Sequence, residues 1–191
     1  NNEAELIRNI LPKEVSCVFI RQESQLGLGH AVLCAERIVG ESPFAVLLAD
    51  DFFPDTNFNI IQDLIQKFET SGKSQISVVQ VRKEETSKYG IVRPGRRNQV
   101  LGLEEKPEIE NAASCMASIG RYVLTSDIFN VLHTLLPGRA EEIQLADAIH
   151  IQAMSQGVFY EEARGVRFDC GSIEGYLNAV SHEAKIRGFD F

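Results

Sequence analysis

The stretch that most constrains the fold is residues 45–51, an apolar run that ends abruptly in two carboxylates, with the sequence Ala-Val-Leu-Leu-Ala-Asp-Asp. A short apolar run bounded by polar residues is typical of a strand buried on both faces, in the middle of a parallel sheet. Ligands collect outside the carboxyl ends of such strands, where an Asp can reach a metal ion or a phosphate. Asp is also a common turn former, so this stretch alone favours a turn before Pro54 over a metal site.

Composition places the chain among ordinary globular proteins. Its 191 residues fit one domain, and its 44% hydrophobic and 24% charged residues argue against disordered and fibrous classes. No apolar run is long enough to cross a bilayer, so we expect no membrane partner. The formal net charge is −8 and no cluster of Lys and Arg is present, so we expect no nucleic-acid partner. A small anionic ligand would need a divalent cation or well-placed basic groups to offset the repulsion.

The cysteine pattern bears on the cellular compartment. The four cysteines, Cys17, Cys34, Cys115 and Cys170, are widely spaced and form no Cys-x-x-Cys pair. This spacing indicates reduced, buried thiols and disfavours a disulfide framework or a zinc site. No stretch matches a signal or transit sequence, and we expect a cytoplasmic protein.

The first half of the chain alternates strands and helices. After a short helix at residues 3–11, the pattern predicts a strand over 15–20, a helix over 31–37, a strand over 44–48, a helix over 59–70 and a strand over 75–81. The loop before the second helix contains Gly27 and Gly29. Strand, loop, helix and strand make a βαβ unit, whose crossover is expected to be right-handed.

The second half of the chain changes character. It predicts a hairpin of residues 89–92 and 99–103, a strand over 116–124, helices over 126–135, 141–155 and 173–187, and a short β pair at 158–160 and 166–168. We therefore expect an α/β fold in which an incomplete doubly wound mixed sheet has helices on both faces and a small β-hairpin excursion. Residues 1–191 would form a single domain.

Polar residues stand at several predicted strand ends and loops: Gln22 with Gly27, Asp50, Gly90, Glu105 with Lys106, and Asp169. Taken singly, each has a structural explanation. Gly27 and Gly29 do not form a G-x-G-x-x-G motif, and two glycines before a helix are more often chain geometry than a phosphate cradle. An exposed Glu-Lys pair contributes little to stability. Asp169 could cap the helix that follows Gly171.

Taken together, these features resemble the motifs of bacterial UTP-glucose-1-phosphate uridylyltransferases, in order and at compatible spacing from residue 15 onward. The motifs are Arg21-Gln22, Gly27-Leu28-Gly29-His30-Ala31-Val32, Leu48-Ala49-Asp50-Asp51, Tyr89-Gly90-Ile91-Val92, Glu105-Lys106-Pro107, Gly120-Arg121-Tyr122-Val123-Leu124, residues 142–149 and Asp169-Cys170-Gly171. Several of them are shared with the wider nucleotidyltransferase group, which includes thymidylyltransferases. The Gly-Leu-Gly-His-Ala-Val run and Asp-Cys-Gly favour the uridylyl branch.

The resemblance implies a reaction and a role for each residue. A phosphate oxygen of glucose 1-phosphate would attack the α-phosphorus of UTP, giving UDP-glucose and pyrophosphate. The resemblance implies that Gln22 and the backbone of Gly27 contact uracil. It also implies that Asp50 holds the catalytic Mg²⁺ and that Asp169 approaches the same or a second metal ion. Gly90 and Glu105 would bind glucose hydroxyls, and Lys106 would pair with the sugar phosphate. Asp51 is expected to remain a turn residue.

Those residue types suit the implied chemistry. Phosphoryl-type transfer asks the protein mainly to position two anions and to spread their charge, which a carboxylate-held Mg²⁺ and a Lys can do. Neighbouring side chains on a strand point to opposite faces, so Glu105 and Lys106 can meet one ligand only where the strand ends or twists. Pro107 directly after the pair makes such an ending the expected one.

The chain also departs from the family pattern. The family carries a glycine-rich loop with Thr, Arg and a later Lys after its first strand, and no stretch of this chain matches that loop. We therefore expect an N-terminally truncated nucleotidyltransferase domain that is by itself inactive. An open sheet edge promotes association, so we also expect a homo-oligomer. Two other functions stay open: a thymidylyltransferase acting on glucose 1-phosphate, and a non-catalytic paralogue that pairs with an active subunit.

Overall fold

The computed structural model describes residues 12, 14–54, 58–138 and 141–189 of the chain. In this part the elements follow in the order α2 Leu28–Leu33, α3 Glu36–Val39, β1 Phe44–Leu47, β2 Asp51–Phe52, α4 Ile60–Ser71, β3 Ser74–Gln80, η1 Lys83–Lys88, β4 Gly90–Pro94, η2 Arg96–Asn98, β5 Val100–Glu105, β6 Met116–Leu124, α5 Asp127–Thr134, α6 Leu145–Ser155, β7 Val158–Glu162, β8 Phe168–Asp169 and α7 Ile173–Ile186. The helix predicted for residues 3–11 lies outside the described residues.

The central mixed sheet is organised around β6. Strands β5, β4, β6, β3 and β7 lie in that order, and β1 also pairs with β6. Strand β6 is antiparallel to β1, β3 and β4, whereas β3 and β7 are parallel. Along the edge of β6 opposite β3, β4 pairs at Ala117 and β1 pairs from Arg121 onward. The middle of that edge, between the end of β1 and the start of β4, therefore pairs with neither of these two strands. It is open to the loops that follow the strands.

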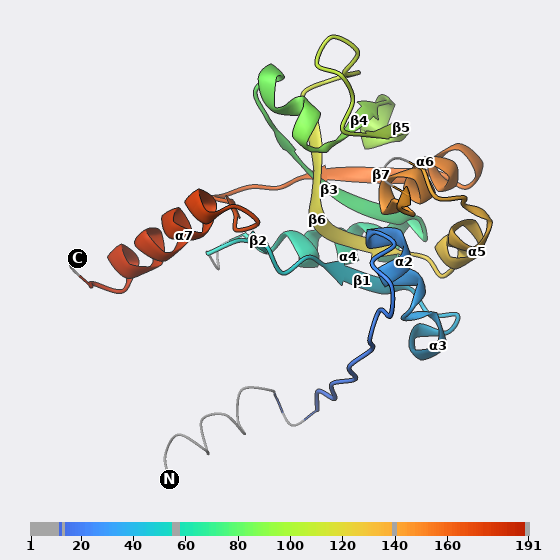
Figure 1. The fold of residues 1–191 in the computed structure, drawn as a ribbon, viewed down its shortest axis with the longest axis horizontal. Coiled ribbons are helices and arrows are strands. Elements are labelled where there is room, and N and C mark those ends of the chain that lie inside the picture. The colour runs from blue at the N-terminus through green and yellow to red at the C-terminus, as the bar shows by residue number, and fades with distance from the viewer. Residues whose placement is uncertain (1–11, 13, 55–57, 139–140, 190–191) are drawn as a thin grey trace.

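Helices cover both faces of the sheet, as predicted (Figure 1). On one face, α2, α5 and α6 supply the larger core cluster, in which Leu132 and Ile149 pack with Ile76 and Leu124. On the other face, α4 packs Ile60 and Leu64 against the sheet at Val123. Helix α7 projects away from this body, beside the short ribbon of β2 and β8 (Figure 1). The predicted α/β class with a mixed sheet is confirmed.

The strand predicted for residues 15–20 is wrong. The segment has no strand pairing in the described part of the chain, and its apolar side chains are exposed, with Phe19 at 94% and Val18 at 61%. A strand requires a hydrogen-bonding partner as well as an apolar sequence, and no described strand lies along this segment. Without it, the predicted right-handed βαβ unit is wrong as well.

Strand β1 also differs from its prediction. It is four residues long, pairs antiparallel to β6, and alternates half-buried with exposed side chains along its length. It is therefore not a strand buried on both faces within a parallel sheet. Half-buried Phe44 and Val46 pack against the core, whereas Leu47 on the other face is 54% exposed. Because this exposed residue is also apolar, the sequence does not show the alternation.

Other predicted elements formed with different partners or bounds. Strands β7 and β8 do not pair with each other, because β7 extends the sheet beside β3 and β8 pairs with β2. Helix α6 begins at Leu145, four residues later than expected. The hairpin of β4 and β5, strand β6, and helices α4, α5 and α7 are confirmed.

Two expectations drawn from the sequence concern the state of the cysteines and the presence of membrane-spanning helices. All four cysteines are unpaired, as predicted, but they are not buried: Cys17 is exposed and the other three are half-buried. None of the helices in the described part of the chain combines the length and the apolar character that a membrane span requires.

Candidate active site

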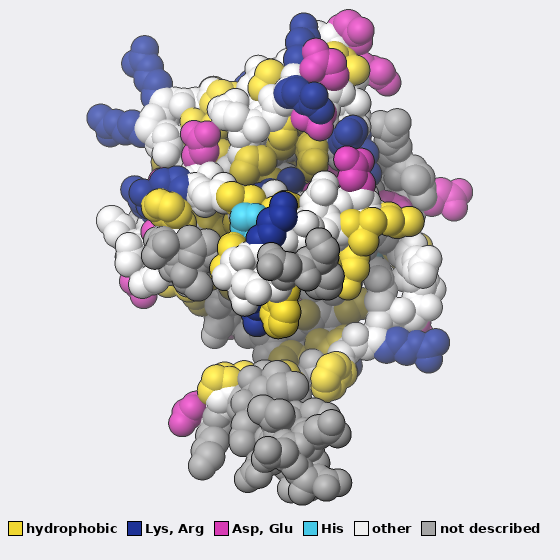
Figure 2. Space-filling view, turned by 90° about the vertical axis from the view of Figure 1, so that its left-hand side faces the viewer, with side chains coloured by type: hydrophobic (Ala, Val, Ile, Leu, Met, Phe, Trp, Pro, Cys, Tyr) yellow, Lys and Arg dark blue, Asp and Glu magenta, His cyan; other side chains and the backbone are white. Residues whose placement is uncertain are grey.

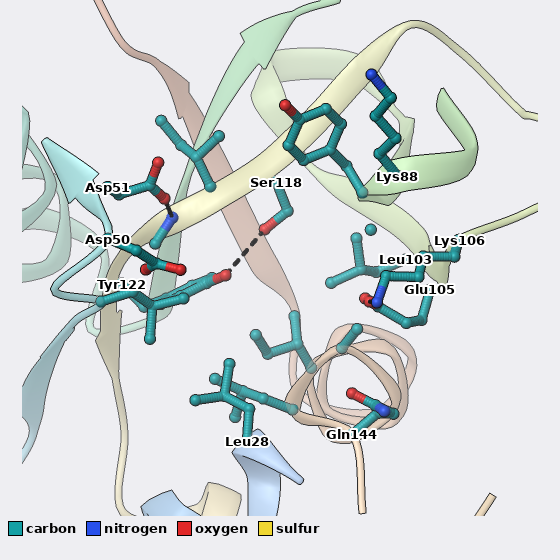
Figure 3. Close-up of a pocket in the computed structure, with 18 of the residues that line it drawn as sticks. Leu28, Asp50, Asp51, Lys88, Leu103, Glu105, Lys106, Ser118, Tyr122 and Gln144 are labelled. Carbon is teal, nitrogen blue, oxygen red and sulfur yellow. Dashed lines mark hydrogen bonds and ion pairs between the residues drawn. The ribbon is translucent and has the colours of Figure 1, made fainter. Parts of the chain in front are cut away.

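A pocket of about 270 Å³ lies at the open middle of the β6 edge, between the end of β1 and the start of β4. Five of the seven predicted site residues line it: Asp50, Gly90, Glu105, Lys106 and Asp169. Asp50 lies on one side of the pocket, and Glu105 and Lys106 lie on the opposite side (Figure 3). Residues from four separate stretches of sequence are thereby brought to one cavity.

The acidic side of the pocket is built from the β2–β8 ribbon. Asp51 of β2 is directly opposite Asp169 of β8, and the Cys170 amide donates a hydrogen bond of 2.7 Å to the carbonyl oxygen of Asp50. The side chain of Asp169 accepts from the Gly171 amide at 3.1 Å, which turns the chain toward α7. These backbone contacts bring Asp50 and Asp169 together, although 118 residues of sequence lie between them.

Gly171 leaves a space between the two carboxylates. A Cβ atom at this position would lie 3.1 Å from Oδ1 of Asp169 and 3.3 Å from Oδ2 of Asp50. No three His, Cys, Asp or Glu side chains among the described residues gather closely enough to hold a metal ion alone. Mg²⁺, however, is usually held by one or two carboxylates together with substrate phosphates and water. Two carboxylates around an open space fit that mode of binding.

The opposite side of the pocket is formed where β5 ends. Lys106 has a positive φ of 48°, which breaks the alternation of the strand directly after Glu105. The Lys106 amide donates to the Tyr89 carbonyl at 3.0 Å, and its Nζ lies 3.7 Å from Oε1 of Glu105. The left-handed turn thus lets two consecutive residues line one cavity, as the position of Pro107 predicted.

The Glu105 carboxyl is only partly solvated. Its side chain is 23% exposed, and burial raises its pKa above the ordinary value, against the opposing effect of the nearby Lys106 ammonium. Gly90 of β4 is paired with it in the sheet, and a Cβ on Gly90 would lie 3.1 Å from Oε2 of Glu105. The absence of a side chain at position 90 therefore leaves Glu105 open to a ligand.

Gln22 and Gly27 do not line this pocket. The Gln22 amide donates to the Gly27 carbonyl at 3.1 Å and lies 2.8 Å from Nδ1 of His30. Gly27 has a φ of 90°, and a Cβ there would lie 2.8 Å from the Ile143 carbonyl oxygen. Close backbone contact therefore explains this glycine without a ligand, although Leu28, the next residue, does line the pocket.

Asp51 was expected to be a turn residue, and this was wrong. It is 5% exposed, and its carboxylate forms an ion pair with Arg167 and accepts a hydrogen bond from the Gly120 amide. Burial opposes the charge on Arg167, but Asp51 outweighs it and raises the pKa of the guanidinium. Neither residue carries a local sequence signal for this pairing beyond the position of Arg167 two residues before Asp169.

The floor of the pocket comes from β6. Tyr122 is buried, and burial raises the pKa of its hydroxyl to about 12. Ser118 lies across the floor, with its hydroxyl 3.5 Å from that of Tyr122 (Figure 3). Arg121 donates to the carbonyl oxygens of Leu48 at 2.8 Å and Asp51 at 2.6 Å, which fixes the loop after β1. The sequence predicted no role in the pocket for Ser118 or Tyr122, and Arg121 fixes the loop from outside the pocket lining.

A mixed sheet with paired carboxylates facing a Glu-Lys pair across one pocket defines a class of protein. The family model described as Nucleotidyl transferase matches residues 2–186, and the chain belongs to this family. The resemblance drawn from the sequence is thereby confirmed at the level of the family.

Its relatives narrow the class further. The chain is 39% identical over 184 residues to the UTP–glucose-1-phosphate uridylyltransferase of Haemophilus ducreyi, an alignment covering 91% of this chain and 62% of the relative. It is 42% identical over 166 residues to UTP–glucose-1-phosphate uridylyltransferase 2 of Staphylococcus saprophyticus, covering 85% and 57%. The chain thus spans about three-fifths of the length of these curated relatives, and its likeness to bacterial uridylyltransferases is confirmed.

Solved structures agree with this likeness. A UDP-glucose pyrophosphorylase complexed with UDP-glucose matches with a TM-score of 0.88 and 37% identity, covering 96% of this chain and 71% of that chain. A UTP-bound UGPase from Acinetobacter baumannii matches with a TM-score of 0.83 and 37% identity, covering 95% and 65%. A glucose-1-phosphate thymidylyltransferase from Bacillus anthracis, at 22% identity and a TM-score of 0.71, shares the fold.

Proposed function

We propose that this chain carries the sugar-binding and metal-binding part of an enzyme that transfers a uridylyl group from UTP to glucose 1-phosphate. The products would be UDP-glucose and pyrophosphate. The observation that carries the proposal is the pocket that Asp50 and Asp169 line together with Glu105 and Lys106, and in which Asp50 lies opposite Glu105 and Lys106. Uridylyltransferase relatives at 37–42% identity support the choice of UTP and glucose 1-phosphate as substrates.

Asp50 and Asp169 would hold a Mg²⁺ ion. The open space between their carboxylates beside Gly171 supports this assignment. Such an ion, when bound, offsets the negative charge of the nucleotide phosphates. The carboxylates would fix the position of that ion, and through it the position of the nucleotide phosphates relative to the sugar phosphate. Because the formal net charge of the chain is −8, a cation at this position also reduces the repulsion that an anionic substrate meets.

Lys106 would pair with the phosphate of glucose 1-phosphate, and Glu105 with Gly90 would bind the glucose hydroxyls. Glu105 presents an acceptor at the pocket wall, and Lys106 places an ammonium beside it, so one turn offers groups for a hydroxyl and for an anion. In our proposal Gln22 and the backbone at Gly27 contact uracil. Their support is the family resemblance and the position of Leu28 at the pocket wall.

We further propose that the protein is a cytoplasmic homo-oligomer. Four unpaired thiols, Cys17, Cys34, Cys115 and Cys170, suit a reducing compartment. Large apolar side chains stand exposed on α7, including Ile173 at 82% and Leu177 at 59%. Exposed apolar surface of this kind favours association with another chain.

The test is an assay of the full protein with UTP, glucose 1-phosphate and Mg²⁺, following pyrophosphate release and identifying UDP-glucose by chromatography. We expect Asp50→Asn, which keeps the size of the side chain, to lower kcat by about 100-fold because one metal ligand loses its charge. Asp127→Asn, at an exposed position outside the pocket, is the matched control and should keep wild-type activity.

Three results would contradict the proposal. They are a wild-type protein that releases no pyrophosphate from glucose 1-phosphate with either nucleotide, a preference for dTTP over UTP, and an Asp50→Asn variant that keeps full activity. The second result would identify a thymidylyltransferase. The first would leave the non-catalytic paralogue as the remaining function.

A further inference from the structure

The strongest unassigned feature of the molecule is the buried ion pair between Asp51 and Arg167. The two side chains are 6% and 15% exposed, and the pair joins residues 116 positions apart in the sequence. The second oxygen of Asp51 accepts from the Gly120 amide, and the Asp51 carbonyl accepts from Arg121 at 2.6 Å. A buried charge pair is costly to desolvate unless its remaining hydrogen bonds are satisfied, and both carboxylate oxygens of Asp51 are hydrogen-bonded here.

This ion pair adjoins the two candidate metal carboxylates and lines the same pocket. Asp51 follows Asp50 in the chain and is opposite Asp169 in the β2–β8 ribbon. Arg167 lies two residues before Asp169, and its Nη2 is 3.8 Å from Oδ2 of that residue. The ribbon has only two residues in each strand, so few backbone hydrogen bonds hold its strands together. The Asp51–Arg167 pair therefore supplies a side-chain link between them.

Arg167 lines the pocket, but its described contacts are with groups of the protein. Its Nε is engaged by Asp51, and its guanidinium lies 5.5 Å from the centre of the Tyr89 ring. The Tyr89 hydroxyl in turn lies 3.3 Å from Oδ2 of Asp169. The guanidinium thus contacts groups of the protein on both the Asp51 and the Asp169 side.

We propose that Asp51 and Arg167 are positioning residues, which hold Asp50 and Asp169 at the separation that a divalent cation requires. This inference rests on the proposed function, since it takes those two carboxylates as the metal ligands. Residues behind metal ligands commonly change metal affinity by about 10- to 100-fold when they are replaced. The ion pair would act in the free protein, before any nucleotide binds.

An electrostatic effect and a loss of positioning predict opposite changes in metal affinity when Arg167 is replaced. Removing a positive charge near two carboxylates strengthens their attraction for a cation, so charge alone predicts equal or tighter metal binding by Arg167→Met. Loss of positioning predicts weaker binding by the same variant. For Asp51→Asn, both effects predict weaker metal binding, so only the replacement of Arg167 distinguishes them.

The experiment measures Mn²⁺ binding to the full protein without nucleotide, by the electron paramagnetic resonance signal of free Mn²⁺. We expect Arg167→Met and Asp51→Asn each to weaken binding about tenfold, and the double variant to be no weaker than the weaker single one, because the residues act as a unit. Arg164→Met is the matched control. It removes an Arg of the same segment whose partner, Asp63 at 3.3 Å, lies outside the pocket.

Thermal unfolding accompanies each titration to establish that the variant is folded. If Arg167→Met does not fold, the double variant of Asp51→Asn and Arg167→Met is used, because it leaves no unpaired charge in the buried site. The inference again requires weaker Mn²⁺ binding than wild type. Equal or tighter binding by a folded Arg167 variant overturns it, as does an effect of Arg164→Met of the same size.

The result separates this inference from the proposed function. Wild-type protein that makes UDP-glucose while Arg167→Met binds Mn²⁺ normally refutes only the positioning role. Wild-type protein that makes no UDP-glucose while its Mn²⁺ affinity responds as expected refutes only the reaction. If Asp50→Asn leaves Mn²⁺ binding unchanged, the metal site itself is wrong and the inference fails with it.

Discussion

At the scale of single residues, Glu105 combines a ligand-facing position with an unfavourable environment for its charge. Burial raises the pKa of its carboxyl in the folded protein. The folded state therefore binds this proton more readily than the unfolded chain does. The carboxyl contributes stability that is fully present below its ordinary pKa and is lost as the pH rises through the raised value.

We predict from this that Glu105→Gln is more thermostable than wild type at neutral pH, because Gln carries no charge to desolvate. The difference should shrink as the pH falls below the ordinary range of a Glu carboxyl, where both side chains are neutral. At the same time UDP-glucose should bind about tenfold more weakly, because hydrogen bonds to a charged acceptor are stronger than those to a neutral one. Melting temperatures from pH 4 to 7 and calorimetric titration of UDP-glucose measure both effects.

Glu104→Gln is the control for that prediction, since Glu104 is exposed on the same strand and lies outside the main pocket. It should change neither the pH dependence nor the affinity for UDP-glucose. A Glu105→Gln variant that is less stable than wild type at pH 7 would show that the Lys106 contact outweighs the burial of the charge.

The residues of the pocket were predictable to different extents. The resemblance could identify residues that lie within short motifs of consecutive residues, namely Asp50, Glu105, Lys106 and Asp169. Asp51 and Arg167 could not be paired in the same way, because their contact joins two segments 116 residues apart and depends on the register of a two-residue ribbon. A long-range side-chain contact leaves no periodicity in either segment.

At the scale of elements, β6 shapes the pocket through an irregularity at its centre. Its pairing with β3 shifts register between Ile76 and Ser77, so that Gly120 and Arg121 have no direct partner on β3. The Ser77 hydroxyl lies 2.7 Å from the Arg121 carbonyl, and the Gly120 amide donates to Asp51. This bulge turns polar backbone groups of β6 toward the loop after β1, which a regular strand would not do.

We predict that Gly120→Ala destabilises the protein by about 1–3 kcal/mol, because the added methyl group overpacks this contact. Its Cβ would lie 2.5 Å from Cβ of Leu48 and 2.6 Å from Oδ2 of Asp51. Chemical denaturation measures the loss. Gly138→Ala is the control, since its Cβ would meet nothing closer than Oδ2 of Asp147 at 3.8 Å. Equal stability of the two variants would mean that the loop after β1 moves aside without cost.

Elements with local signals were predicted well. Helix α4 has Asn59 as its N-cap and Gly72 in the left-handed conformation at its end, and both residues are visible in the sequence. In the hairpin, β4 and β5 pair with each other, so the partner of each strand is close to it in the sequence. The strand at residues 15–20 did not form, and β1 formed without the predicted parallel, doubly buried environment. The environment of a strand is set by distant segments, and its apolar residues do not say which strand lies beside it.

At the scale of the whole molecule, α7 is the least integrated element. It extends from the β2–β8 ribbon away from the sheet (Figure 1), and hydrophobic side chains reach the surface on this side of the molecule among charged ones (Figure 2). Its exposed apolar residues are Ile173, Tyr176, Leu177, Val180 and Ile186. The first four recur at the spacing of a single helical stripe. An apolar stripe in contact with water favours association, and it adjoins the candidate metal site through Cys170 and Asp50.

This arrangement predicts that charge on the α7 stripe lowers the oligomeric state of the full protein. Leu177→Glu places a carboxylate where a second chain would have to desolvate it, so we expect the dissociation constant of the oligomer to rise about tenfold or more. Light scattering coupled to size-exclusion chromatography, over a range of protein concentrations, measures the change. Asn178→Glu adds the same charge at the neighbouring exposed polar position and should leave the assembly intact. If both variants keep the wild-type mass at every concentration, the subunits associate through another surface; if wild type is itself a monomer, the expected homo-oligomer is wrong.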